Sequence, residues 1–288
     1  MQTAPRSNAG PLIEIGARTA RLSRERLFFW LLLAASANSM MGPAVRSVLD
    51  HGAAYSIFNL LGVSAIVWTA LVAGLAMLAD ENGKRATRAD YAVALLASLM
   101  IMLPMANASS VALTLLAIYG IATGVRGSNL RRAGIVFLSI STSLIWGRLL
   151  LALFSRSLLH VDAFFITKLT GAQQIGNRIL FIDQSQGGFV VAPGCSSLQG
   201  MSLAFVFWAT VTQWYRVPFK LKSALWCAAA VTATLAINII RMGALAHFPE
   251  HFEAIHTGWG WHLASWSTLT AVVAIVIYGA RHEIFDDG

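Results

Sequence analysis

The sequence predicts an all-α integral membrane protein, a polytopic bundle of about eight transmembrane helices. Hydrophobic residues make up 57% of the 288 residues and charged residues only 12%, against about 25% charged residues in a soluble domain. Several apolar runs approach the roughly 20 residues that a helix needs to cross a ~30 Å hydrocarbon core. Because these runs lack the alternation of barrel strands, and only helices or closed barrels satisfy their backbone in lipid, we expect helices.

The chain is expected to form one integral membrane domain over residues 27–280, between tails at 1–26 and 281–288. The first and third candidate spans are short, which predicts that they are tilted or partly interfacial. The eight candidate spans are 27–42, 55–79, 90–105, 108–125, 133–155, 195–214, 222–246 and 262–280.

Basic residues are distributed unevenly about these spans. Fifteen Lys and Arg lie in the two tails and in the loops after the second, fourth and sixth spans, and four lie on the opposite side. Because cytoplasmic loops retain positive charge, both termini are expected in the cytoplasm. The net charge of +8 is thereby explained by orientation in the membrane, and no nucleic-acid partner is expected.

The longest stretch between spans, residues 156–194, is then on the outer side of the membrane. Its sequence predicts an amphipathic helix (VDAFFITKL) and two short strands at 179–183 and 189–192. Gly187 and Gly188 favour a hairpin turn between the strands. Pro193 and Gly194 end this outer helix-plus-hairpin insertion, and the sixth span is expected to begin at Cys195.

Cys195 is one of only two cysteines, and the other, Cys227, lies within an apolar run. A thiol at a helix N-terminus feels the positive end of the helix dipole, and a nearby cation further favours the reactive thiolate. Ser196 or Ser197 is expected to cap this helix. The alternative is that Cys195 is a small buried hydrophobe, as most free cysteines are.

Arg241 lies inside the seventh span, ~7–8 Å from its outer end at the helical rise. A charge within a span costs roughly 2.5–3.5 kcal/mol on insertion scales and marks a candidate functional site. Asn238 precedes it by three residues and shares its helix face. The alternative is that Arg241 extends to the lipid headgroups. Arg148, at a similar depth in the fifth span, either does the same or adds positive potential to the same pocket.

Four histidines and two glutamates lie in the outer loop before the last span. Histidine suits general acid–base chemistry because it titrates near neutral pH. A metal site is the alternative, but the H-E-x-x-H pattern does not occur, and we expect neither a metal nor a cofactor. The residues of this loop are His247, Glu250, His251, Glu253, His256 and His262.

Three motifs on the last three spans resemble the exosortase/archaeosortase family: APGCSSLQGMS, AINIIRM and HTGWGW, in that order over roughly residues 130–280. The family's cysteine follows an outer hairpin, its arginine motif is N-x-x-R, and its histidine precedes x-x-x-G-W. These features match Cys195, Arg241 and His256, whereas His262 remains an alternative to His256. The family usually carries glycine two positions after the cysteine, where this chain has Ser197, so the oxyanion pocket or the substrate is expected to differ.

The resemblance implies a membrane-embedded cysteine protease or transpeptidase of the bacterial inner membrane, with its active site on the periplasmic face. Such enzymes cleave a C-terminal sorting signal from secreted proteins, which comprises a short motif such as Pro-Glu-Pro, a transmembrane helix and a basic tail. The bacteria that carry such enzymes often make exopolysaccharide. The implied catalytic residues are Cys195, Arg241 and His256, with Asn238, Ser196, Ser197, Arg148 and His262 as accessory or substrate-binding residues.

The expected partners are therefore secreted proteins with such a signal and the lipid bilayer, and the sequence leaves the oligomeric state open. It also leaves open hydrolysis by water or transfer to an amine. The alternative function is a polytopic transporter or a scaffold in exopolysaccharide export, in which Arg148 and Arg241 bind an anion.

Overall fold

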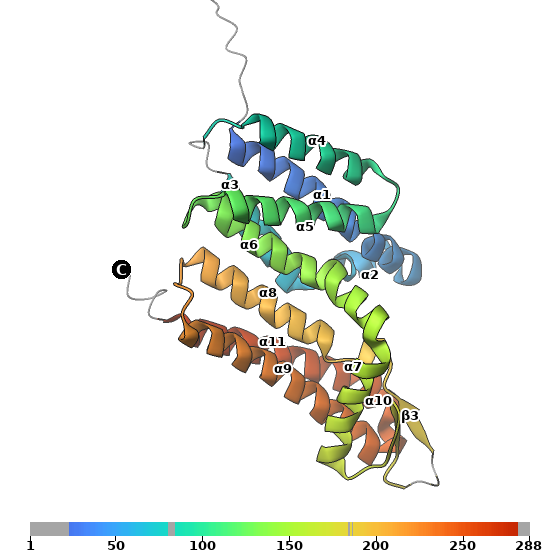
Figure 1. Cartoon of the computed structure of the whole chain (residues 1–288). Coiled ribbons are helices and arrows are strands. Elements are labelled where there is room, and N and C mark those ends of the chain that lie inside the picture. The colour runs from blue at the N-terminus through green and yellow to red at the C-terminus, as the bar shows by residue number, and fades with distance from the viewer. Residues whose placement is uncertain (1–22, 80–83, 184, 186, 282–288) are drawn as a thin grey trace, which may run out of the picture.

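A computed structural model describes residues 23–79, 84–183, 185 and 187–281. In these ranges the chain is a bundle of α-helices that lie side by side, with a small β-sheet at one end (Figure 1). The helices are α1 (Arg24–His51), α2 (Ala53–Phe58), α3 (Ala65–Leu78), α4 (Arg88–Met102), α5 (Ala106–Thr123), α6 (Asn129–Ser141), α7 (Gly147–Thr170), α8 (Leu198–Trp214), α9 (Leu221–His247), α10 (Phe252–His256) and α11 (Trp259–Gly279).

The predicted all-α membrane class agrees with this structure. Within the described residues, four helical segments are long and apolar enough to cross a bilayer: Arg24–His51, Asn129–Thr170, Leu221–His247 and Trp259–Gly279. Two further apolar helices, Ala65–Leu78 and Asn107–Thr123, are shorter. The chain is therefore an all-α membrane protein, and the number of eight spans remains a prediction.

The prediction of one continuous span over residues 55–79 is wrong. A short helix and a tight turn precede α3, and Leu60 and Leu61 in that turn have φ of 53° and 57°. A right-handed helix cannot continue through that left-handed conformation. Only the 14 residues of α3 remain helical without interruption, or ~21 Å at the helical rise.

The fifth span and the outer amphipathic helix were predicted as separate elements, and they are one helical segment. A π-helical turn at Thr142–Trp146 joins α6 to α7 without a loop. Phe154 then kinks α7, with φ −119° and ψ 19°, and Figure 1 shows α7 turned away from the direction of α6. The segment has 42 residues and is therefore ~63 Å long, about twice the thickness of a hydrocarbon core.

The predicted hairpin forms, and it belongs to a three-stranded antiparallel sheet of β1 (Gln174–Ile175), β2 (Arg178–Leu180) and β3 (Gly188–Val190). Ile179 pairs with Phe189 across the hairpin, and both side chains are buried in a cluster with α7 and α9. Gly188 is required there, because a Cβ at this position would lie 2.3 Å from the Ile179 carbonyl oxygen. The strand β1 was not predicted.

Contacts at the opposite end of the bundle gather the basic loops. The Arg24 Nε lies 2.8 Å from Oδ1 of Asp90, whose side chain is fully buried, so the starts of α1 and α4 lie together. Arg132, at the start of α6, donates to the carbonyl oxygens of Gln213 and Trp214 at the end of α8. These contacts bring four helix ends and their basic residues to one end of the molecule.

Candidate functional site

Cys195 ends a 3₁₀ turn, Pro193–Cys195, which follows β3. The prediction that Cys195 begins the sixth span is wrong, because α8 begins at Leu198. The thiol is therefore placed by the sheet and the turn rather than by the first turn of a helix. Cys195 is buried, with 8% of its surface exposed.

The structure brings Cys195, Arg241 and His256 together from three separate elements. The Cys195 Sγ lies 3.4 Å from the His256 Nε2, and Phe252 stacks on the His256 ring with centroids 5.1 Å apart. Arg241 in α9 donates to the His256 carbonyl oxygen at 3.5 Å and to Oδ1 of Asn238 at 3.2 Å. Asn238 in turn donates to the Cys195 carbonyl oxygen at 2.9 Å. This chain of contacts links the turn, α9 and α10 around one thiol.

Asp162 in α7 holds the residues that follow the cysteine, and sequence reasoning missed it. The residue is 4% exposed, and its carboxylate accepts hydrogen bonds from the hydroxyls of Ser196 at 2.8 Å and Ser197 at 2.6 Å. It also accepts from the Ser197 backbone N–H at 3.3 Å. The one signal in the sequence was an acid inside the apolar run VDAFFITKL.

The expected capping role of these serines is corrected in part. Ser197 occupies the N-cap position of α8, but its side chain makes no capping hydrogen bond because its hydroxyl donates to Asp162. The Ser196 Oγ accepts instead from the backbone N–H of Leu198 at 3.3 Å. Ser197 thus occupies the position where the family that the motifs resemble has glycine, and its hydrogen bond to Asp162 anchors the turn.

Four consecutive backbone N–H groups, those of residues 195–198, are engaged. Those of Cys195 and Ser196 donate to Ala192 and Pro193, and those of Ser197 and Leu198 donate to side chains. None of the four is free to stabilise a charge that develops on a substrate at this thiol.

Two cavities meet at the site. The outer one, of about 600 Å³, is lined by Cys195, Arg241 and His256. The second, of about 680 Å³, extends from Arg241 along α8, α9 and α11 toward the middle of the bundle. Gly194, Arg241 and Trp261 line both, so the two cavities adjoin at these three residues.

Two of the predicted accessory residues are not brought to the site. Arg148 is exposed on α7 and lines neither cavity, so the expectation that it shares a pocket with Arg241 is wrong. The transporter alternative needed these two arginines at one cavity. His262 is also exposed, and its ring packs edge-on against Trp261 with centroids 5.0 Å apart.

The histidines of the outer loop do not form a ligand set. His247 contacts the Gly243 carbonyl oxygen, and His251 lies 3.6 Å from a carboxylate oxygen of Glu250. Among the residues that the structure describes, no three His, Cys, Asp or Glu are grouped to hold a metal ion. Cys195 and Cys227 are both free thiols.

Comparisons of this chain with protein-family models, with curated proteins and with solved structures find no match. The chemistry is therefore argued from the geometry. A thiol beside an imidazole is the arrangement that activates a sulfur nucleophile, and a half-buried guanidinium at the same cavity is suited to stabilise developing negative charge.

Proposed function

We propose that the protein is a membrane-embedded cysteine peptidase or transpeptidase that acts on peptide bonds at one face of a bilayer. The observation that carries the proposal is the 3.4 Å distance between the Cys195 Sγ and the His256 Nε2, in a cavity that Arg241 also lines. The class is the one that the three sequence motifs imply by their resemblance to exosortases.

In the first step the Cys195 thiol gives its proton to His256, and the thiolate attacks the carbonyl carbon of the scissile peptide bond. Negative charge then develops on the carbonyl oxygen. Because the backbone N–H groups of residues 195–198 are engaged, we assign a side chain as a donor to this oxygen. Arg241 fits that role, since its guanidinium lines the cavity beside the thiol and Asn238 fixes one of its nitrogens.

In the second step the carbon–nitrogen bond breaks, and the leaving amine takes the proton from His256. The acyl group remains on Cys195 as a thioester. His256 then removes a proton from water, which gives hydrolysis, or from an amine, which gives transpeptidation, and the thiol is restored when the carbon–sulfur bond breaks.

We propose the bacterial inner membrane as the location, with the site on the periplasmic face and both termini in the cytoplasm. The basic loops gathered at one end of the bundle support this orientation. Arg241 is 19 residues beyond Lys222 on α9, so the site is ~28 Å from the basic end, close to a hydrocarbon thickness. The eight spans would be α1, α3, α4, α5, α6 with the first part of α7, α8, α9 and α11, the shorter ones lying in locally thinned bilayer.

The proposed substrates are secreted proteins that end in an apolar helix and a basic tail, as the resemblance implies. The basic tail would remain in the cytoplasm by the rule that orients the enzyme. The bond to be cleaved then lies near the outer end of the apolar helix, at the depth of Cys195.

The test is co-expression with an epitope-tagged single-span secreted protein of the same genome that ends in an apolar helix and a basic tail. We expect Cys195→Ala, Arg241→Ala and His256→Ala each to abolish loss of the tail while the protein still inserts. The matched controls, Cys227→Ala, Arg148→Ala and His262→Ala, change the same residue types away from the site and should process normally. Normal processing by Cys195→Ala would overturn the proposal. Loss of processing in the control variants would also overturn it.

A further inference from the structure

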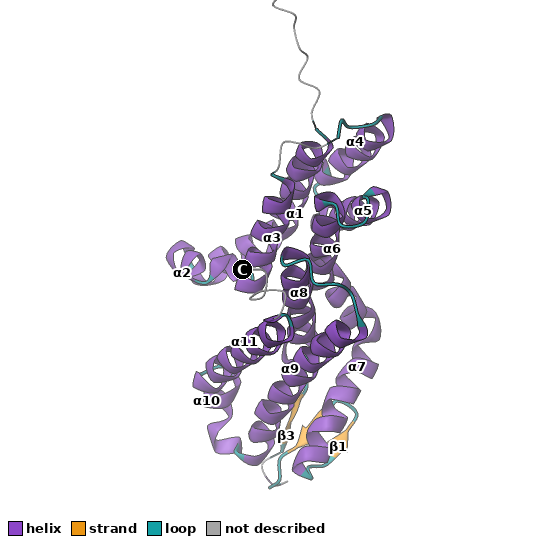
Figure 2. Ribbon diagram, turned by 90° about the vertical axis from the view of Figure 1, so that its left-hand side faces the viewer, coloured by secondary structure: helices purple, strands orange, loops and turns teal. Residues whose placement is uncertain are grey.

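The second cavity is a groove between α3 and α11, which we call the α3–α11 groove. α8 packs against both of these helices and forms the floor with α9. α2 projects from the bundle beside α3 (Figure 2), and His51 of α1 and Tyr55 of α2 also line this cavity. At Gly194, Arg241 and Trp261 the groove adjoins the cavity of the thiol.

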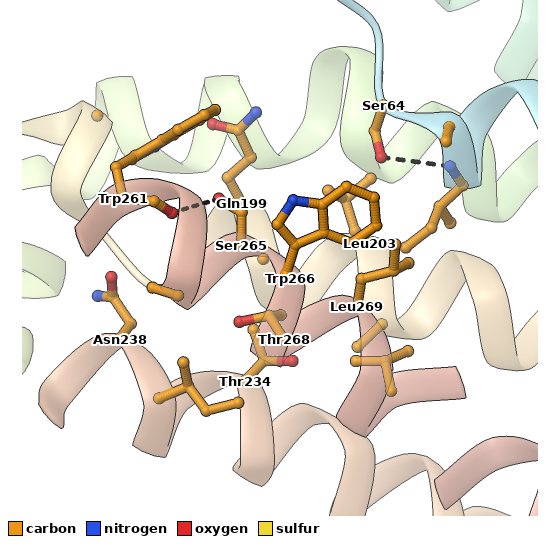
Figure 3. Close-up of a pocket in the computed structure, with 18 of the residues that line it drawn as sticks. Ser64, Gln199, Leu203, Thr234, Asn238, Trp261, Ser265, Trp266, Thr268 and Leu269 are labelled. Atoms are coloured by element: carbon orange, nitrogen blue, oxygen red, sulfur yellow. Dashed lines mark hydrogen bonds between the residues drawn. The ribbon is translucent and has the colours of Figure 1, made fainter. Parts of the chain in front are cut away.

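The lining of this groove changes along its length. Near the thiol it is polar, with Gln199 from α8, Asn238 from α9 and Ser265 from α11, which Figure 3 shows around the same space. Farther along, Leu203 and Leu269 make the lining more apolar, although Thr234 and Thr268 lie beside Leu269. A groove lined only for lipid chains would be apolar throughout, because a polar group at membrane depth without a partner is costly.

Gln199 gives the polar part a side-chain amide that no other described residue engages. Its side chain is exposed in the groove, and within the described residues its amide has no hydrogen-bond partner. Thr268 and Trp266 line the same wall, with Trp266 66% exposed. An intact helix would not use these groups, because its backbone hydrogen bonds are already satisfied internally. An unwound backbone at this depth requires such partners.

We propose that the α3–α11 groove binds an unwound stretch of the substrate that lies directly C-terminal to the scissile bond. The polar part of the groove takes over the hydrogen bonds of the opened backbone, and the substrate's apolar helix continues along the apolar part. This inference rests on the proposed peptidase function. It identifies the substrate as a chain whose helix begins only after the polar part of the groove, and not at the cleaved bond.

The length of the polar part sets the length of this stretch. Trp261 and Thr268, both in the lining, are seven residues apart on α11, which corresponds to ~10 Å at the helical rise. An extended chain advances ~3.3 Å per residue. The groove therefore accommodates about three unwound residues between the scissile bond and the helix.

The test uses the tagged single-span protein of the co-expression experiment and a pair of serines on α11. Ser265 and Ser267 are both exposed, but only Ser265 lines the groove. The Ser265 hydroxyl bonds only within its own helix, to the Trp261 carbonyl oxygen, so either serine can be replaced without breaking a contact between helices. We expect Ser265→Trp to fill the groove and abolish tail loss, and Ser267→Trp to process like the wild type.

A second variant removes hydrogen bonding without filling space. Gln199→Leu keeps the side-chain size and should slow tail loss about two- to thirteen-fold, as expected for one hydrogen bond of ~0.5–1.5 kcal/mol. Conversely, replacing the three residues after the cleaved bond with leucine and alanine, which favour helix, should slow processing by the wild type. Replacing the same three residues with glycine and asparagine should leave the rate of processing unchanged.

Alkylation of Cys195 by an impermeant maleimide separates this inference from the function on which it rests. The reaction needs no substrate, so Ser265→Trp should be alkylated at the wild-type rate while processing is lost. Equal processing by Ser265→Trp and the wild type would overturn the groove proposal and leave the peptidase intact. The groove proposal would also be overturned if both tryptophan variants lost processing equally, or if the helix-forming substrate residues had no effect on processing.

Discussion

Asp162 explains how a serine takes the position of the glycine expected after the cysteine. The carboxylate binds the hydroxyls of Ser196 and Ser197 together with one backbone N–H, and it is buried. The turn that presents the thiol is thus tied to α7, while Asn238 ties its other side to α9. We regard Asp162 as a positioning residue, because it contacts the turn and not the reacting atoms.

Replacing Asp162 should therefore impair processing more than stability. Hydrogen bonds to a charged group contribute about 1.5–3 kcal/mol each, so losing one correct contact lowers the population of the active turn roughly ten- to hundred-fold. We expect Asp162→Ala to reduce tail loss by at least that factor. Asp162→Asn should restore part of the activity, because its carbonyl oxygen can still accept the hydrogen bonds that one carboxylate oxygen accepts.

The measurement compares the rate of tail loss with the melting temperature in detergent. Asp50→Asn, which changes an exposed acid on α1, is the control for the change in charge. If Asp162→Asn behaves like Asp162→Ala, or if the melting temperature falls in step with activity, the residue acts through stability alone and the positioning role is refuted.

The sequence was sufficient to choose the three central residues but not their anchor. Cys195, Arg241 and His256 were predicted because a thiol, a buried cation and an imidazole each carry chemistry, and because their motifs resemble a family. Asp162 could not be found in this way, because it meets Ser196 from 34 residues away, through a helix whose direction the sequence does not specify.

At the scale of elements, the joined helix α6–α7 determines where that carboxylate lies. The π-helical turn at Thr142–Trp146 has one more residue per hydrogen-bonded turn than an α-helix. Such a turn accommodates an extra residue without rotating the helix that follows. In a regular α-helix, by contrast, each residue turns the chain by about 100°.

Two single-residue deletions should consequently have opposite effects. Deleting Ser143 should convert the π turn to regular helix and keep Asp162 beside the serines, so that processing is largely retained. Deleting Ala152, which lies in the α-helical part of α7, should rotate the rest of that helix by about 100° and abolish processing. Equal activity of the two variants at equal expression would contradict this account of the junction.

The broken second span and the continuous fifth span mark the limit of pattern reasoning. An apolar run predicts that a segment is buried in lipid. The helix break occurs at Leu60 and Leu61, which have positive φ, and leucine gives no sequence signal of such a break. Likewise, the amphipathic pattern of residues 161–169 predicted a helix correctly but not that it continues the preceding span. The hairpin was predictable because Gly187 and Gly188 are a local signal.

At the scale of the molecule, the basic loops lie at one end of the bundle and the candidate active site lies at the other. The ion pair of Arg24 with buried Asp90 and the contacts of Arg132 with the end of α8 hold the basic loops together. The uneven distribution of charge in the sequence predicted this separation. The contacts themselves join residues more than 60 positions apart, which no local pattern encodes.

The orientation can be tested by labelling single cysteines in a background with Cys195→Ala and Cys227→Ala. We expect Glu250→Cys, in the loop between α9 and α10, to react with an impermeant maleimide in cells whose outer membrane is permeable to the reagent. Lys220→Cys, in the exposed loop between α8 and α9, should react only after the inner membrane is permeabilised. The reverse pattern would invert the topology and place the site in the cytoplasm.

The central claim is that the sulfur of Cys195 carries the acyl group of the substrate. Acid quenching of the working enzyme, followed by mass spectrometry of the peptide that contains Cys195, tests it most directly. We predict an adduct with the mass of the substrate's new C-terminal segment, which neutral hydroxylamine removes. An unmodified Cys195 during continued turnover, or an acyl group on another residue, would contradict the account.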